Sequence, residues 1–270
     1  MKRYFSVLIL IVCLIFIFGN STLAEKSQYL IVDDLTDFAA DPFDAILKQQ
    51  SIYMWFIPPA ILLAFDHSLY NQFEDNMFLP LRKDLPASIF ASTVKTNYIF
   101  ESMQMAFLST RAIHNDKLAQ YAYLSAETVI DAWIVSQTLK HCFGRARPEP
   151  RSDKGPYSWG NFNTEMLGGE TSFPSTHTTV YFAYATILGK VLEQEWMSEV
   201  LGSALYFLEI GPHHHWLSDM CVSYLLGKSI AEYVWSKRDE RDYKSDWFIS
   251  PIFYYADHKV YPGFRVWKFL

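Results

Sequence analysis

Two histidines of this sequence stand in settings that suit proton or phosphoryl transfer. His215 precedes Asp219 by four residues, so on a helix their side chains share a face. An aspartate in that position can fix the imidazole tautomer and raise its basicity, which prepares a histidine as a nucleophile or base. His177 follows Ser175 where the pattern predicts the start of a helix. The alternative there is an ordinary capping serine before a half-buried histidine.

The predicted start of that helix is also a ready site for an anion, because its backbone N–H groups and its positive dipole end face outward. Ser175 and Thr176 lie at this point. Upstream, the cations Lys140, Arg145 and Arg147 fall within eight residues at the mouth of a long loop. Guanidinium groups match phosphate oxygens and lysine adds a compact charge, so these side chains could converge on a polyanion. The alternative is a helix C-terminus whose positive charge serves the helix dipole.

Three consecutive histidines, residues 213–215, raise the question of a metal site. Neighbouring histidines on a helix point in different directions, and no cysteine or carboxylate cluster stands at ligand spacing beside them. We therefore expect neither a metal nor another cofactor.

Taken together, these segments resemble the signature of the type 2 phosphatidic acid phosphatase (PAP2) and vanadium haloperoxidase superfamily. Its pattern is a lysine and, after six other residues, Arg-Pro; then Pro-Ser-Gly-His; then Ser-Arg, five residues before a histidine that precedes an aspartate by four. Thr176 stands in the glycine place, and the residues that match are Lys140, Arg147, Pro148, Pro174, Ser175, His177, His215 and Asp219. Their order and spacing make the combination specific.

The resemblance implies a PAP2/haloperoxidase-like helical bundle and a phosphatase that acts on a phosphomonoester or a lipid phosphate. His215 would attack phosphorus and form a phosphohistidine, Asp219 would hold its ring, and His177 would protonate the departing alcohol and later activate water. Because phosphoryl transfer needs positioning and charge neutralisation, the mechanism implies no metal. The phosphoryl oxygens would be held by Lys140, Arg147, Ser175 and the backbone N–H of Thr176.

One position departs from the pattern, because Leu208 and Glu209 stand where the family has Ser-Arg. The exchange removes a phosphate ligand and sets a carboxylate beside a dianion, which costs about 4 kcal/mol at ~4 Å and an effective dielectric near ~20. The cost disappears if Glu209 faces away, pairs with Arg145, or is offset by His213 and His214. Two alternatives to an active phosphatase therefore stay open: a weakened or inactive relative that binds phosphorylated lipid, and a vanadate-dependent haloperoxidase.

The elements that must position these residues are mostly helices. Prolines and glycines between residues 142 and 173 predict a long loop of the kind that is usually functional. The aromatic and β-branched tail predicts a small C-terminal β-hairpin. Apolar residues three and four apart predict helices over about 52–65, 86–113, 117–141, 177–194, 196–210 and 214–236.

The chain divides into four predicted parts. These are a signal peptide, N-terminal lead-in helices, a PAP2-like core, and a charged linker with the aromatic hairpin, over residues 1–24, 25–85, 86–236 and 237–270. The signal peptide is predicted from a basic start, an apolar run and small residues before the cleavage point, which makes the protein periplasmic or secreted. The alternative is an uncleaved anchor. Export would expose Cys142 and Cys221 to oxidising conditions, and whether they form a disulfide stays open.

Composition limits the partners. The 270 residues are 50% hydrophobic and 17% aromatic, with a formal net charge of −6, so a basic face for nucleic acid is not expected. After the signal peptide no apolar run reaches the length of a spanning helix, although the aromatic content leaves room for peripheral contact with a membrane. The expected partner is thus a small phosphorylated or lipid phosphate substrate, and the sequence leaves the oligomeric state open.

Overall fold

Helices make up most of the described structure. It is a computed structural model that describes residues 52–73, 76, 116–148, 155–160, 171–209, 215–240, 247–256 and 259–268. The protein is mostly α, as the sequence predicts. In chain order the elements are α4 (Ile52–Phe73), α7 (Asp116–Phe143), α8 (Thr176–Val191), α9 (Trp196–Glu209), α10 (Leu217–Ser236), the short 3-10 helix η3 (Arg238–Glu240), β1 (Trp247–Ala256) and β2 (Lys259–Lys268).

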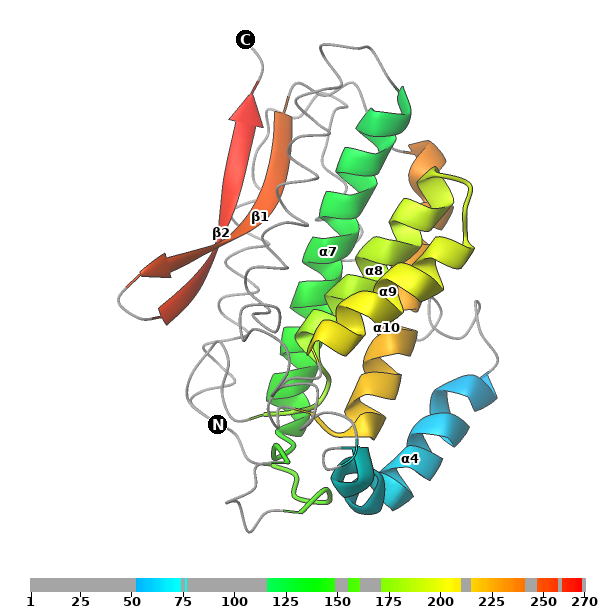
Figure 1. Cartoon of the computed structure of the whole chain (residues 1–270). Coiled ribbons are helices and arrows are strands. Elements are labelled where there is room, and N and C mark those ends of the chain that lie inside the picture. Colours follow the sequence, from blue (N-terminus) through cyan, green and yellow to red (C-terminus); the bar gives the residue numbers. More distant parts are fainter. Residues whose placement is uncertain are drawn as a thin grey trace.

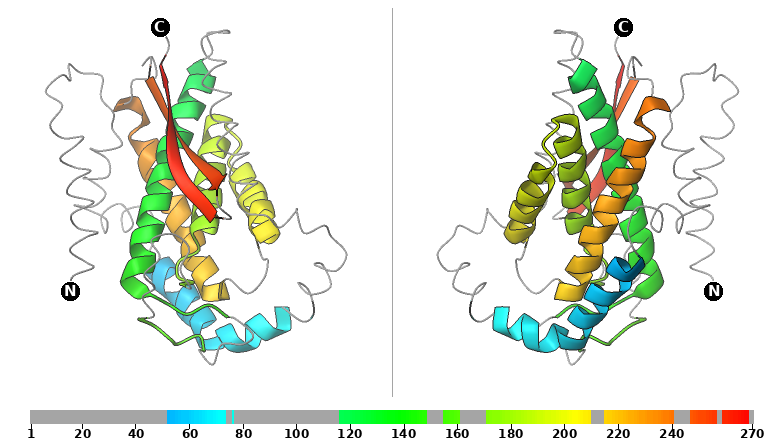
Figure 2. Two further views of the ribbon diagram at one scale, coloured as in Figure 1. Left: turned by 90° about the vertical axis from the view of Figure 1, so that its left-hand side faces the viewer. Right: turned by 90° about the vertical axis from the view of Figure 1, so that its right-hand side faces the viewer.

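The central helix of the bundle is α8, which packs against α7, α9 and α10, while α4 packs against α10. The end of α7 and the starts of α8 and α10 lie at one end of the bundle, and α4 lies at this same end (Figure 1; Figure 2). The first, second and third motifs of the family pattern are represented by residues 140–148, 174–177 and 215–219, and they are thereby gathered in one region (Figure 1).

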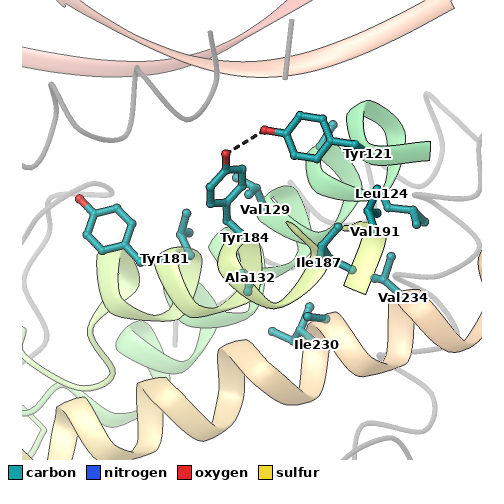
Figure 3. Packing of buried hydrophobic residues seen from close by; sticks show 14 of the residues in the cluster. Tyr121, Leu124, Val129, Ala132, Tyr181, Tyr184, Ile187, Val191, Ile230 and Val234 are labelled. Atoms are coloured by element: carbon teal, nitrogen blue, oxygen red, sulfur yellow. Dashed lines mark hydrogen bonds between the residues drawn. The ribbon is translucent and has the colours of Figure 1, made fainter. Parts of the chain in front are cut away.

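The hydrophobic core lies between α7, α8 and α10 (Figure 3). Because apolar residues of α8 face both neighbours, nearly every described position of this helix is buried. The hydroxyl groups of Tyr121 and Tyr184 share a hydrogen bond of 2.8 Å at the edge of the core, so neither buried phenol is left without a partner. The largest fully buried apolar side chains are Leu124, Val129, Tyr181, Ile187, Leu226, Ile230 and Val234.

A glycine sets the close approach of α10 to α8. A Cβ at Gly227 would lie 2.4 Å from the carbonyl oxygen of Thr179, which no side chain tolerates. The absence of a side chain at this position therefore lets the two helices that carry the second and third motifs pack against each other.

Of the six predicted helices, the last four agree with α7, α8, α9 and α10 to within three residues at each end. The helix predicted over 86–113 lies outside the described residues, as do residues 1–51. The first predicted helix was expected to end before the charged Asp66, but α4 continues to Phe73. The reason is that Asp66 is buried and paired instead of facing solvent.

Two strands follow the helices. β1 and β2 pair antiparallel, with Trp247 opposite Lys268 and Ala256 opposite Lys259, and β1 packs against α7. Residues 257 and 258 between them lie outside the described residues, so the hairpin stays a prediction. Within the described ranges, the search for a helix of sufficient length and apolarity to span a membrane found none.

Candidate active site

Lys140 lies near the end of α7, with its side chain directed into the protein. The Nζ atom donates a hydrogen bond of 2.9 Å to the carbonyl oxygen of Thr171. Burial and the nearby Arg147 lower the pKa of Lys140 to about 7, and Asp219 acts in the opposite direction. These electrostatic interactions indicate that Lys140 lies near both Arg147 and Asp219.

The lowered pKa of Lys140 predicts a pH-dependent stability. Between pH 7 and the ordinary lysine value, the unfolded chain holds this proton while the folded chain releases it, so the lysine makes the unfolding free energy rise with pH. Between pH 6 and pH 9, wild type is expected to gain about 3 kcal/mol relative to Lys140→Met. Urea unfolding of both proteins at each pH measures this difference. An equal pH response of the two proteins would contradict the lowered pKa.

Ser175 caps the start of α8. Its Oγ atom accepts hydrogen bonds from the Thr178 backbone N–H, at 3.4 Å, and from the Thr178 hydroxyl, at 2.9 Å. The backbone N–H of Ser175 donates to Oγ of Ser223 on α10, at 2.7 Å. Gln137 of α7 donates to Oγ1 of Thr176, at 3.1 Å. The first turn of α8 is therefore held by hydrogen bonds from α7 and α10, with its N–H groups at the end where the motifs meet.

His177 is the second residue of α8 and is half-buried. Its ring centroid is 6.2 Å from that of Tyr181, which follows it by one turn on α8. The position next to the helix start suits a proton donor to the leaving group of a phosphate ester whose phosphoryl oxygens bind the N–H groups of this turn.

His215 stands immediately before α10. Its Nδ1 atom is 2.7 Å from the carbonyl oxygen of Ser172, three residues before Ser175. A carbonyl oxygen only accepts hydrogen bonds, so Nδ1 carries a proton, and in the neutral imidazole Nε2 then carries the lone pair. The contact brings the third motif to the segment that precedes the second, and it sets the tautomer that a nucleophilic imidazole needs.

Asp219 is fully buried in the first turn of α10. One carboxylate oxygen accepts the Trp216 backbone N–H at 2.9 Å, and the other accepts a hydrogen bond from Arg145. Burial raises the pKa of Asp219, and Arg145 opposes this shift. The carboxylate thus binds the backbone of the residue that follows His215. That Asp219 holds the ring of His215 stays a prediction, since Nδ1 of that ring binds the Ser172 carbonyl oxygen.

Arg145 is the centre of a buried charge network that the sequence analysis did not predict. Its guanidinium donates through Nε to the Pro156 carbonyl oxygen at 2.9 Å, through Nη1 to the Ser218 hydroxyl at 2.7 Å and to Asp219, and through Nη2 to Asp66 at 2.7 Å. The expectation that Arg145 joins Lys140 and Arg147 around a polyanion is therefore wrong, because two carboxylates already neutralise it.

The side chain of Glu209 lies outside the described residues, so the three ways of accommodating its carboxylate, a pair with Arg145 among them, stay predictions. Glu209 is the last residue of α9.

The sequence signal that could have revealed the charge network around Arg145 is Asp66, a charged residue that follows a long apolar segment.

Two other expectations concern cysteines and metals. Cys142 and Cys221 are free thiols in the structure, the first exposed and the second half-buried. In the ranges that the structure describes, no three histidine, cysteine or carboxylate side chains gather as a metal ion would require.

Comparison with known proteins identifies the domain. The family model of the PAP2 superfamily matches residues 121–243. This region belongs to the PAP2 superfamily. The matched PAP2 region contains every residue that the sequence nominates for the site, whereas Asp66 on α4 lies outside it. Searches among curated proteins and among solved structures found no match. Membership of the PAP2 superfamily indicates a phosphatase-type hydrolase.

Proposed function

We propose that the protein is an exported, metal-independent phosphatase that hydrolyses a phosphomonoester or a lipid phosphate through a phosphohistidine at His215. The observation that carries the proposal is the hydrogen bond from Nδ1 of His215 to the Ser172 carbonyl oxygen. It prepares Nε2 for attack and ties the nucleophile to the segment that leads into the α8 anion site.

The reaction takes two steps. In the first, the Nε2 lone pair of His215 attacks phosphorus, the P–O bond to the alcohol breaks, and His177 gives its proton to the departing oxygen. In the second, His177 removes a proton from water, the water oxygen attacks phosphorus, and the P–N bond breaks to release inorganic phosphate. His177 and His215 return to their starting states, so atoms and protons balance.

The remaining nominated residues supply charge and dipoles. Lys140 and Arg147 would neutralise the phosphoryl oxygens, and the N–H groups at Thr176 and the following residue would bind them along the axis of α8. Ser175 would fix the first turn of this helix through its capping hydrogen bonds. Asp219 would hold the backbone beside the nucleophile through Trp216.

The direct test is phosphate release by the purified full chain in the presence of a chelator. Para-nitrophenyl phosphate and phosphatidic acid in detergent micelles represent the two substrate classes. We expect turnover of at least one of them, with the same kcat with and without EDTA. No release from either substrate, or activity that requires an added metal, would overturn the proposal.

A second candidate function, that of a weakened relative which binds phosphorylated lipid, is favoured by Glu209. Glu209→Arg is expected to raise kcat/KM about tenfold or more, because it removes a like charge and restores a phosphate ligand. The matched control is Glu195→Arg, which makes the same charge change at a largely exposed carboxylate and should leave kcat/KM unchanged. An inactive wild type together with an active Glu209→Arg would establish the second candidate.

Export and membrane association are part of the same proposal. They are supported by the basic start, the apolar run and the small residues within residues 1–24, and by the aromatic content of the chain. Mass determination of the protein recovered from the periplasm or medium of a host cell tests them, with loss of residues 1–24 as the expected result.

A further inference from the structure

We propose that Asp66 of α4 is a positioning residue for the reaction at His215, so that α4 is a working part of the active site although it lies outside the matched PAP2 region. The inference rests on the proposed function. It would also explain why a helix with a largely exposed surface carries a fully buried charge.

Asp66 differs from the rest of α4 in its burial. Among the positions of this helix whose side chains the structure describes, Asp66 alone is buried, and its side chain is 0% exposed. Ile57, Ile61 and Phe65 are all more than half exposed. Burial of a carboxylate is costly unless it is paired and hydrogen-bonded, so its contacts must repay the desolvation.

Those contacts converge on the start of α10. One carboxylate oxygen of Asp66 accepts the backbone N–H of Ser218 at 2.9 Å, and the other accepts the hydroxyl of Ser218 and Nη2 of Arg145. Ser218 is the second residue of α10. A carboxylate there satisfies one of the N–H groups that a helix start leaves without an intrahelical partner, and it also interacts favourably with the helix dipole.

A continuous chain of contacts leads from Asp66 to the nucleophile. Arg145 binds Asp66 through Nη2, and through Nη1 it binds both Ser218 and Asp219. Asp219 in turn holds the backbone N–H of Trp216, the residue directly after His215. Two carboxylates, one on α4 and one on α10, thus bind the same guanidinium and the backbone at the start of α10.

A second contact from α4 reaches the same segment. The ring of Tyr70, one turn after Asp66, lies 5.5 Å from that of Trp216 in an edge-on arrangement. The segment that carries His215 is therefore contacted both by Ser172 and by α4. A displacement of about 1 Å at a reacting group can cost on the order of 100-fold in rate, so this fixation matters for catalysis.

The experiment compares wild type with Asp66→Asn in the full chain. The amide can still accept the Ser218 N–H, but it presents N–H groups toward Arg145 and removes the charge. We expect kcat to fall about 10- to 100-fold with KM changed less than threefold. Inorganic vanadate, whose five-coordinate form imitates the transition state, should inhibit at least tenfold more weakly, whereas inhibition by inorganic phosphate should change less than threefold.

The matched control is Glu199→Gln. Glu199 forms an ion pair with Lys228, so this variant also removes a carboxylate that binds α10, but near the middle of the helix and at the surface. Its kcat, KM and vanadate inhibition should equal those of wild type. Asp66→Glu, which keeps the charge, should recover part of the lost kcat, as a positioning role requires.

Binding measurements separate a failure of this inference from a failure of the proposed function. Wild-type turnover tests the function, whereas calorimetry of vanadate and phosphate tests Asp66 even in an inactive chain. If Asp66→Asn does not fold, Ser218→Ala takes its place, because it removes one Asp66 contact and leaves the charges paired; we then expect vanadate binding to weaken about threefold or more. Unchanged vanadate binding in a folded variant, or equal weakening of vanadate and phosphate, would overturn the inference.

Discussion

Replacement of His215 with asparagine is expected to lower kcat by about 10⁴-fold or more, because it removes the only atom of the proposed site that forms a bond to phosphorus. Asparagine keeps an N–H group that can reach the Ser172 carbonyl oxygen, so the local fold should be retained. Phosphate-release assays measure the loss. Wild type quenched during turnover of a ³²P-labelled substrate should also carry an acid-labile, base-stable label that the variant lacks.

His141 provides the control for this experiment. Like His215 it is half-buried, and its Nδ1 atom lies 2.7 Å from a backbone carbonyl oxygen, that of Gln137. His141→Asn therefore removes an imidazole in a similar local setting, and kcat should stay within about threefold of wild type. If both variants lost activity equally, or if His215→Asn still acquired the label, another residue would be the nucleophile.

The helical body could be predicted from the sequence because its signals are local. Periodic apolar residues and a capping serine indicate where α7, α8 and α10 lie. The end of α4 was missed for the opposite reason. Its continuation past residue 65 depends on a buried partner for Asp66, and that partner is supplied by a loop about 80 residues further along the chain.

The site shows the same division between local and distant information. Motif spacing nominated Lys140, Ser175 and His215, and the structure brings their segments together through Thr171, Ser172 and Ser223. The arrangement of charges could not be read from the spacing, because it depends on which cation meets which carboxylate.

Arg145 and Arg147 illustrate the limit. They stand two residues apart in the sequence, yet Arg145 is fully buried between carboxylates while Arg147 is half-buried beside Lys140. Chemically identical side chains therefore separate into a structural cation and a candidate ligand. The difference arises because Asp66 and Asp219 form ion pairs with Arg145, whereas Arg147 lies close enough to Lys140 to lower its pKa.

Because Arg145 pairs with two buried carboxylates, Arg145→Met is expected to lower the free energy of unfolding strongly. The substitution leaves Asp66 and Asp219 buried together without the guanidinium that pairs with both. Removal of one partner from a buried ion pair typically costs about 3–5 kcal/mol, against a total stability of about 5–15 kcal/mol for a domain. Urea unfolding followed by circular dichroism should therefore show a loss of at least about 3 kcal/mol at pH 8.

The stability loss of Arg145→Met is also expected to depend on pH. Arg145 opposes the rise that burial causes in the pKa of Asp219, so its removal raises that pKa further. A carboxyl group whose folded pKa lies above its unfolded pKa loses stability as pH rises, and the deficit of Arg145→Met should be smaller at pH 5 than at pH 8. Lys228→Met, which breaks the more exposed pair with Glu199, should cost less than about 1 kcal/mol at either pH. Equal losses in the two variants would show that the buried network does not hold α4 and α10 together.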